Sequence, residues 1–188
     1  MTNVQSSGPS LNSFLALAQT NEALVLKGGE LKPTSEIPAK LGFFGRAVQW
    51  LKTSIGMGPD KANEATRAAF TAALAKQYGE IIADATLHQV KTYQSNDKPL
   101  SSRDIQAVAS RADQLILLRN HAALCKLKLA EAEGRRDLKL FGLELKAAEK
   151  GGKVPIVVKM AAGSEFFLAK QQADEAEQAF KAELFKKV

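Results

Sequence analysis

The sequence has few of the residue types on which metal binding and much of enzyme catalysis depend. It contains one cysteine, Cys125, and two histidines, His88 and His121. A single cysteine excludes an internal disulfide and a CxxC metal pair, and the histidines are too far apart for an HExxH zinc site. Neither of the nucleotide-binding signatures GxxxxGKS/T and GxGxxG occurs. We therefore expect no catalytic residues, no metal and no cofactor.

A catalytic pair of Cys125 with a histidine is formally possible. However, a cysteine on a helix is usually a small, inert, buried hydrophobic residue. The carboxylates are scattered along predicted helix faces with cations between them, which is typical of solvated surfaces. The sequence therefore predicts a protein that is not an enzyme.

Long apolar runs are also missing. No stretch approaches the roughly 18 to 20 apolar residues that cross a bilayer. An ordinary secretory signal peptide has Lys or Arg before its apolar stretch, and this sequence has none there. Charge is abundant instead, since 26 Lys and Arg against 20 Asp and Glu give a formal charge of +6. A basic excess suits an anionic partner such as a lipid surface or nucleic acid.

The N-terminal segment is polar and almost free of charge. Of the first 21 residues, 11 are Ser, Thr, Asn or Gln and none is charged. Because such a segment buries little apolar surface, residues 1–38 are expected to be disordered, either as an ordinary terminus or as an uncleaved type III secretion signal. The apolar patch Leu24, Val25 and Leu26 could add as a strand to the sheet edge of a secretion chaperone, or form a short strand in a loop.

Helical periodicity dominates the rest of the chain. In "LGFFGRAVQWLKT" the apolar positions Leu41, Phe44, Val48 and Leu51 share one helical stripe. Further helices are predicted over 60–78, 80–93 and 101–119, and a closing helix in "SEFFLAKQQADEAEQAFKAELFKK", whereas "KVPIVVKM" resembles a short strand or connector. Short loops make neighbouring helices antiparallel. We predict an all-α protein: an elongated antiparallel bundle of about four helices over 39–120, followed by helical residues 121–188 of unknown role.

In an antiparallel bundle the loops 54–60 and 94–100 lie at the same end. That end collects the cations Lys52, Lys61, Lys91, Lys98 and Arg103, together with Asp60, Asp97 and Asp104. Such a tip could bind anionic phospholipid, since each cation near an anionic leaflet contributes about 1 kcal/mol. It could equally be a solubilising loop end. Trp50 lies at the edge of its stripe, where it is either a core residue or a shallow interfacial anchor.

Four stretches carry a resemblance to a known family: the polar start, "LGFFGRAVQWLKT", "ATRAAFTAALAKQYGEIIADATL" and "DKPLSSRDIQAVASRAD". Over roughly residues 38–120 the chain resembles the N-terminal membrane-localisation domain of bacterial type III secreted effectors, the lipid-raft-targeting domain of large cytotoxic effectors. The resemblance implies a basic bundle tip that binds phosphatidylinositol phosphates, upstream residues that bind a chaperone, and peripheral attachment to the host plasma membrane. By position, the lipid-binding role falls to the same five cations.

The leading hypothesis is therefore a non-enzymatic, type III secreted effector or effector fragment that docks on anionic host membrane. An alternative is a helical protein–protein interaction module, in which residues 120–150 and the closing helix form the working surface. Host proteins are the candidate partners of such a module. Nucleic acid is not expected as a partner, because only Tyr78 and Tyr93 could interleave with basic residues.

Overall fold

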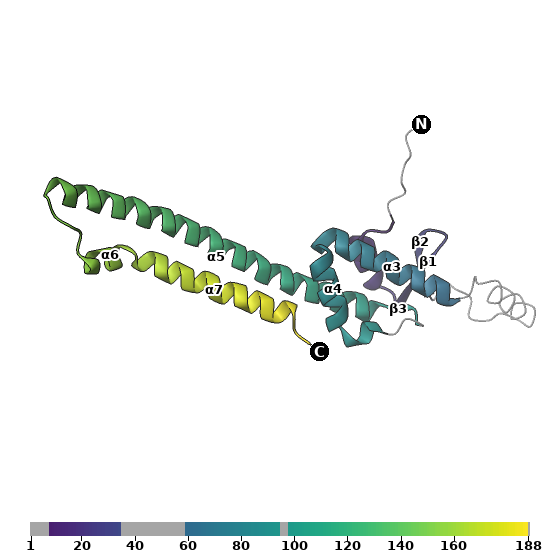
Figure 1. Cartoon of the computed structure of the whole chain (residues 1–188). Helices are drawn as coiled ribbons and strands as arrows, with labels where there is room; N and C mark the ends of the chain where they lie inside the picture. The colour runs from purple at the N-terminus through teal and green to yellow at the C-terminus, as the bar shows by residue number, and fades with distance from the viewer. Residues whose placement is uncertain (1–7, 35–58, 95–97, 188) are drawn as a thin grey trace, which may run out of the picture. The chain divides into compact units, whose positions relative to one another are not determined.

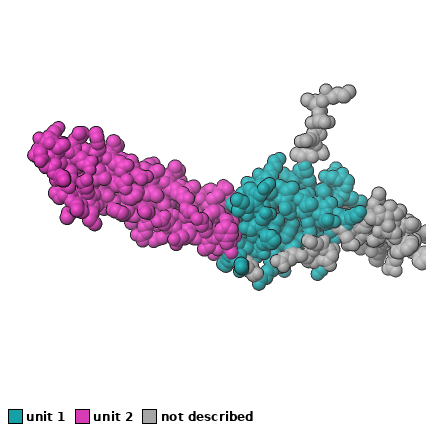
Figure 2. Space-filling model, viewed as in Figure 1, with its two compact units in different colours: residues 1–114, 186–188 teal, residues 115–185 magenta. Residues whose placement is uncertain are grey.

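The computed structural model describes residues 8–34, 59–94 and 98–187. It divides the chain into two compact units, which Figure 2 shows in different colours. Unit 1 comprises residues 1–114 and 186–188, and unit 2 comprises residues 115–185. Among the described residues there are six α-helices, one 3-10 helix and three short strands (Figure 1), so the protein is mainly α-helical.

Unit 1 combines a small sheet with three helices and the beginning of a fourth. Its elements, in chain order, are α1 (Leu11–Ala18), β1 (Ala23–Lys27), β2 (Glu30–Pro33), α3 (Pro59–Tyr78), α4 (Glu80–Gln89), η2 (Lys91–Gln94), β3 (Leu100–Ser101) and the first part of α5 (Ser102–Glu149).

The N-terminal elements have local causes in the sequence. The hydroxyl of Ser10 accepts a hydrogen bond of 3.2 Å from the Ser13 N–H, which caps the start of α1. Gly28 and Gly29 have positive φ angles of 62° and 86°. Glycine adopts such angles without steric cost, so these two residues form the tight turn between β1 and β2.

The sheet has the order β2-β1-β3, and both pairings are antiparallel. The central strand β1 pairs Leu24 with Pro33 on one side and with Leu100 on the other. The Ser102 N–H donates a hydrogen bond of 2.9 Å to the Glu22 carbonyl, which continues the contact to the start of α5. Residues far apart in the sequence therefore join one sheet.

The core of unit 1 lies between the sheet, α1 and the helices α3, α4 and α5. The rings of Phe14 on α1 and Phe70 on α3 meet edge to face, with centroids 5.2 Å apart. Other large side chains that are fully buried here come from α1, the strands, α3 and α5: Leu11, Leu24, Leu74, Leu100, Ile105 and Val108. Burial of these residues is the main force that holds the short strands in place.

Unit 2 is a helical hairpin. It contains α5 from residue 115 onward, α6 (Ile156–Ala162) and α7 (Ser164–Leu184). Gly151, with a φ of 65°, lies in the connection that follows α5, and α7 then runs antiparallel to α5 (Figure 1). Small residues fill the contact between the two helices: Ala122, Cys125, Ala173 and Ala176.

The structure corrects the expected disorder of residues 1–38. Residues 8–34 form α1, β1 and β2, and Leu11, Phe14 and Leu24 are buried. Although this segment is mostly polar, it contains a few large apolar residues, and α3 and β3 cover them. Residues 1–7 and 35–38 lie outside the described residues. The sheet also makes the class mainly α rather than all-α.

The predicted division at residue 120 falls inside a helix. A single helix of 48 residues, α5, continues through this position, and the two compact units meet along the chain between residues 114 and 115. The predicted helix over 39–55 lies outside the described residues. The stretch "KVPIVVKM", expected as a strand or connector, contains the helix α6.

Candidate functional site

The first candidate site is the predicted basic tip in unit 1. Lys61, Lys91, Lys98 and Arg103 are all exposed, whereas Lys52 and Trp50 lie outside the described residues. The elements that carry them are the first turn of α3, η2, the segment before β3 and the first turn of α5.

Arg67 brings two of these elements together. Its guanidinium donates hydrogen bonds to the Tyr93 carbonyl (2.8 Å) and the Lys98 carbonyl (3.2 Å), and its charge lies 4.9 Å from the centre of the Tyr93 ring. The side chain is 6% exposed. Because Lys61 lies six residues before Arg67, about 9 Å along the helix, the start of α3 and the segment at Lys98 share one end of unit 1.

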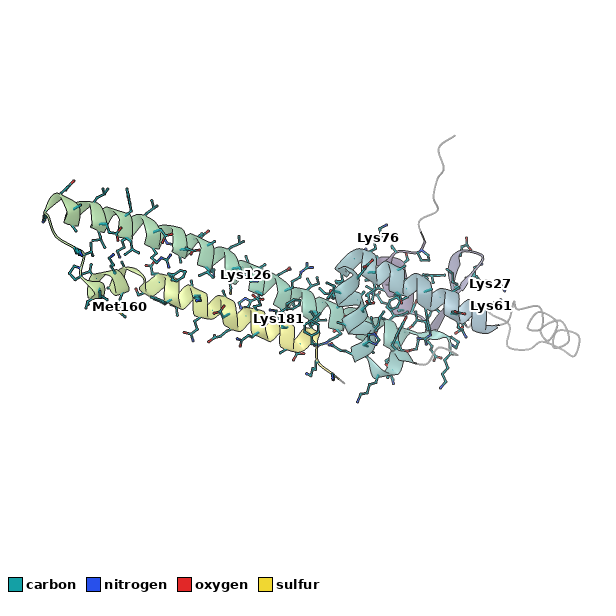
Figure 3. The ribbon with its side chains drawn as sticks, viewed as in Figure 1. Lys27, Lys61, Lys76, Lys126, Met160 and Lys181 are labelled. Atoms are coloured by element: carbon teal, nitrogen blue, oxygen red, sulfur yellow. The ribbon has the colours of Figure 1, made fainter. Side chains whose placement is uncertain are left out.

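Lys27 joins this end, although it was not among the predicted residues. The Leu26 N–H donates a hydrogen bond of 2.7 Å to the Thr66 hydroxyl, which itself donates to the Ala62 carbonyl. This bond fixes the end of β1 against the first turns of α3. Figure 3 accordingly shows Lys27 and Lys61 at the same end of unit 1. A sequence signal existed, since Lys27 directly precedes the Gly-Gly turn.

Arg103 is placed apart from these lysines. It follows Ser102, whose hydroxyl donates to the Asn21 carbonyl and whose N–H donates to Glu22, before the start of β1. Lys98 precedes β3, whose antiparallel register carries the chain at Lys98 toward the Lys27 end of β1. The two cations therefore lie toward opposite ends of a strand about 13 Å long. We call Lys27, Lys61 and Lys98 the basic end of unit 1, whereas a position of Lys91, exposed on η2, at this end stays a prediction.

The predicted chaperone-binding patch lies inside the fold of unit 1. Leu24 and Val25 are buried, and β1, which also contains Leu26, has a partner strand on each side. Its backbone can therefore not pair with an external strand while the sheet is intact. Chaperone binding through these residues stays a prediction that requires the sheet to open.

The second candidate site is the face of α5 that unit 2 leaves uncovered. Ion pairs join the helices of the hairpin: Lys126 Nζ lies 2.6 Å from Glu177 Oε2, and Lys159 Nζ lies 2.7 Å from Glu144 Oε1. Figure 3 shows Lys126 and Lys181, both partners of Glu177, on the facing helices α5 and α7. Together the two lysines lower the pKa of the Glu177 carboxyl to about 2 through hydrogen bonds and charge.

Toward the tip of the hairpin the contact becomes aromatic. The guanidinium carbon of Arg136 lies 4.0 Å from the centre of the Phe166 ring, a cation–π geometry. Phe166 in turn meets Phe167 with ring centroids 5.6 Å apart.

The inner face of α5 is the side that α7 covers. It runs through Cys125, Leu129 and Ala132 to Arg136.

The opposite face of α5 carries a second, uncovered repeat. Its positions alternate in steps of three and four residues, and seven of the ten are apolar: Leu117, Asn120, Leu124, Leu127, Glu131, Gly134, Leu138, Phe141, Leu145 and Ala148. We call these ten positions the outer seam. Each of several members lies two residues after an inner one, as Leu127 follows Cys125, a rotation of about 200°. The outer seam therefore points away from α7.

The large side chains of the outer seam are exposed to solvent. Leu124 is 57% exposed, Leu127 62% and Leu138 75%. Of the 14 large apolar side chains that are exposed among the described residues, 13 belong to unit 2 and only Ile81 belongs to unit 1. A repeat of this spacing is the pattern by which one helix packs its side chains between those of another. Contiguous exposed apolar surface marks an interaction site.

Sequence reasoning expected a working surface over 120–150 but did not find this repeat. The signal was present in the spacing of leucines, but Glu131 and Gly134 interrupt it. To assign the repeat to an uncovered face, one must also know which side of α5 packs against α7. Only the three-dimensional structure shows this packing.

Cys125 and His121 lie one helical turn apart on α5. Their Sγ and Nε2 atoms are 3.8 Å apart, a weak hydrogen-bond contact between thiol and imidazole. The thiol is buried among the alanines of the hairpin contact. Within the described ranges, no group of three or more His, Cys, Asp or Glu side chains converges in a way that could hold a metal ion.

None of the helices in the described part of the chain is both long and apolar enough to cross a bilayer. Comparison with protein-family models, with curated proteins and with solved structures found no match. The function must therefore be argued from the residues of the basic end and the outer seam.

Proposed function

We propose that this chain is a non-enzymatic interaction protein whose unit 2 docks an α-helix on the outer seam of α5. The observation that carries this proposal is the repeat of three and four residues on the side of α5 that faces away from α7, with exposed large side chains at Leu124, Leu127 and Leu138. Over 32 residues the outer seam is about 46 Å long, more than four heptads.

Energetics support a docked state. Complete burial of a leucine or phenylalanine side chain contributes about 1.5–3 kcal/mol, and six such residues on the outer seam are at least half exposed: Leu117, Leu124, Leu127, Leu138, Phe141 and Leu145. A partner helix that buries them gains several kcal/mol before the entropic cost of association. Residues of α7 from Lys170 to Gln178 that face away from α5 are polar and offer no comparable gain.

Site-specific photo-crosslinking tests this proposal. A photo-reactive amino acid replaces Leu124 or Leu138 in the full chain, and matched control positions are Gln172 and Gln178, which are exposed on α7. In cells that express the protein, adducts should form from the outer seam, map to the apolar face of a helix, and be weak or missing from the controls. Equal yields from both sets, or no adduct from the outer seam, would contradict helix docking.

A second candidate function is docking on anionic, phosphoinositide-containing membrane through the basic end of unit 1. It is supported by Arg67, whose bonds to the Tyr93 and Lys98 carbonyls bring Lys98 and Lys61 to the same end. Lys27, Lys61 and Lys98 are exposed there. Each cation held near an anionic leaflet contributes about 1 kcal/mol, so several together give reversible attachment that weakens as salt rises.

Vesicle co-sedimentation tests this second candidate. Replacement of Lys27, Lys61 and Lys98 by Glu should lower affinity for vesicles that contain a phosphatidylinositol phosphate by about 100-fold or more. The control, Lys128, Lys170 and Lys187 to Glu, changes the net charge equally on exposed residues elsewhere. If both triple variants lose binding alike, the attraction is one of net charge and the basic end is not a site.

We also propose export by a type III secretion system, with attachment at the host plasma membrane as the expected destination. The uncharged, Ser-rich first 21 residues support it. A reporter enzyme fused to the full chain should enter host cells only when the secretion machine is intact. Entry that does not depend on the machine would remove this proposal without affecting the outer seam.

A further inference from the structure

We infer that the occupant of the outer seam is the outer seam of a second copy of this chain, packed antiparallel. The inference rests on the proposed function and names its partner. It follows from two of the three positions that interrupt the repeat, Glu131 and Gly134 in its middle, and from how the alternative pairings treat them. In heptad terms, Leu117, Leu124, Glu131, Leu138 and Leu145 are a positions, and Asn120, Leu127, Gly134, Phe141 and Ala148 are d positions.

A parallel, in-register pair of outer seams places like positions together. Glu131 would then oppose Glu131 of the second copy inside the contact, so two carboxylates would lose water and repel each other. Gly134 would oppose Gly134, which leaves a void that no side chain fills. Both faults fall in the middle of the outer seam, where packing matters most.

An antiparallel pair with its two-fold axis between residues 132 and 133 removes both faults. In this arrangement each a position opposes a d position, and Glu131 opposes Gly134 of the second copy. The glycine leaves space for the longer side chain and keeps its carboxylate near solvent. Three of the remaining layers are apolar: Leu124 with Phe141, Leu127 with Leu138, and Leu117 with Ala148. The fourth places Leu145 against the polar Asn120 near the end of the outer seam.

The size of this contact matches a specific interface. All ten positions are used, and each copy contributes six large apolar side chains that are at least half exposed. At on the order of 100 Å² for each side chain, twelve of them bury about 1,200 Å², the lower bound for a specific interface. The arrangement is isologous, so it closes as a dimer and does not propagate.

The flanking charges are compatible with the antiparallel pair. Lys128 lies near Arg135 of the second copy in this register, which is a like-charge contact. However, Arg135 already lies 3.9 Å from Glu131 and 3.8 Å from Glu165 in its own chain, so its charge is compensated. Because the contact is mainly apolar, salt should not dissociate the dimer.

Sedimentation equilibrium of the full chain tests the dimer. At about 100 µM the mass should approach twice the 20.2 kDa of the chain. The double variant Leu124→Asp with Leu138→Asp should remain at 20.2 kDa, and its dissociation constant should rise at least about tenfold. Leu168→Asp is the matched control, since Leu168 is 58% exposed on α7, and it should dimerise like the wild type.

The orientation is tested by a distance between spin labels. In a Cys125→Ala background, a label at Lys146→Cys should lie about 40 Å from its copy in the antiparallel dimer. A parallel dimer would place the two labels within about 20 Å, which would overturn the arrangement. A second copy would be excluded as the occupant if the wild type stayed monomeric. It would also be excluded if Leu168→Asp weakened the dimer as much as the double variant Leu124→Asp with Leu138→Asp.

The two proposals fail in different ways. If the chain is monomeric and yet Leu124 and Leu138 cross-link in cells to a helix of another protein, the second copy is excluded and helix docking stands. If the chain is monomeric and these positions form no adduct, both proposals fall.

Discussion

Lys126 Nζ on α5 and Glu177 Oε2 on α7 lie 2.6 Å apart. Lys181 reaches the other oxygen of the same carboxylate at 2.6 Å. The Lys126 pair joins α5 to α7 on the side where the alanine face of α5 is covered, whereas the leucines of the outer seam are exposed. The pH dependence of Glu177 therefore reports on the contact that defines the outer seam.

The two lysines lower the pKa of Glu177 to about 2, so the folded hairpin prefers the charged carboxylate. This contribution to stability is present above the ordinary pKa and is lost as the pH falls toward 2. At neutral pH, Glu177→Gln should lower the melting temperature of unit 2, and the difference from wild type should shrink between pH 4.5 and pH 2. Thermal melts by circular dichroism measure it. Asp174→Asn, an exposed control, should leave the melting temperature nearly unchanged.

The contact between α5 and α7 depends on small side chains. Ala173 is 2% exposed and faces Ala122 and Cys125, so Ala173→Leu should push the helices apart and cost about 1–3 kcal/mol of unfolding free energy. Urea unfolding of the full chain measures this loss. The same change at Ala179, which is exposed, should cost less than about 0.5 kcal/mol. Equal costs at both positions would show that the helices do not approach closely.

Arg67 should be the most sensitive polar residue of unit 1. Arg67→Met removes the donors to two carbonyls and leaves them without these partners, so the unfolding free energy should fall by about 2–4 kcal/mol. Lys76→Met on the same helix, at an exposed position, serves as the control. Denaturant unfolding compares the two. A loss as small as that of the control would mean that Arg67 does not hold the segment at Lys98 against α3.

Ionisation of the Tyr78 hydroxyl should make the folded protein less stable at high pH. Its hydroxyl donates a hydrogen bond of 2.6 Å to Asp113 Oδ1, and burial together with this carboxylate raises the pKa of Tyr78 to about 12. The folded state therefore favours the neutral phenol, whose contribution is complete below pH 10 and is lost as the pH rises through 12. The loss amounts to about 2–3 kcal/mol. The unfolding free energy of Tyr78→Phe should not show this decline. If the unfolding free energies of the variant and the wild type changed with pH in parallel, the role of Tyr78 would be contradicted.

The helices were the most predictable part of the fold. The predicted helix over 60–78 is α3, and the closing helix is α7. The predicted helix over 101–119 is the first part of α5, which begins at Ser102. These elements follow from local periodicity and capping, which a sequence displays directly.

The sheet and the full length of α5 were not predictable in the same way. The strand β1 depends on Leu100 and Ser101, more than seventy residues away, and local patterns carry no record of such a partner. The helix α5 continues through Gly134 and Gly142, although glycine disfavours a helix interior. Contacts with α6 and α7, such as Lys159 with Glu144, stabilise this part of the helix beyond its intrinsic propensity. They also favour the helix α6 over the strand that its valines suggest.

The candidate sites were also predicted only in part. Loop geometry predicted that Lys61 and Lys98 lie at one end, and the bonds of Arg67 support it. Arg103 was misplaced because β3 carries the chain past β1 before α5 begins. The outer seam was missed because a repeat becomes a surface only when the opposite face is known to be covered.

Radical footprinting of the side chains of the outer seam tests helix docking most directly, because it detects any occupant. In dilute purified protein Leu124, Leu127 and Leu138 should be oxidised readily, since they are more than half exposed. In cells that express the protein their oxidation should fall several-fold, while exposed Leu168 on α7 is oxidised as before. Equal oxidation of the outer seam in dilute solution and in cells would contradict the proposal that a helix docks there.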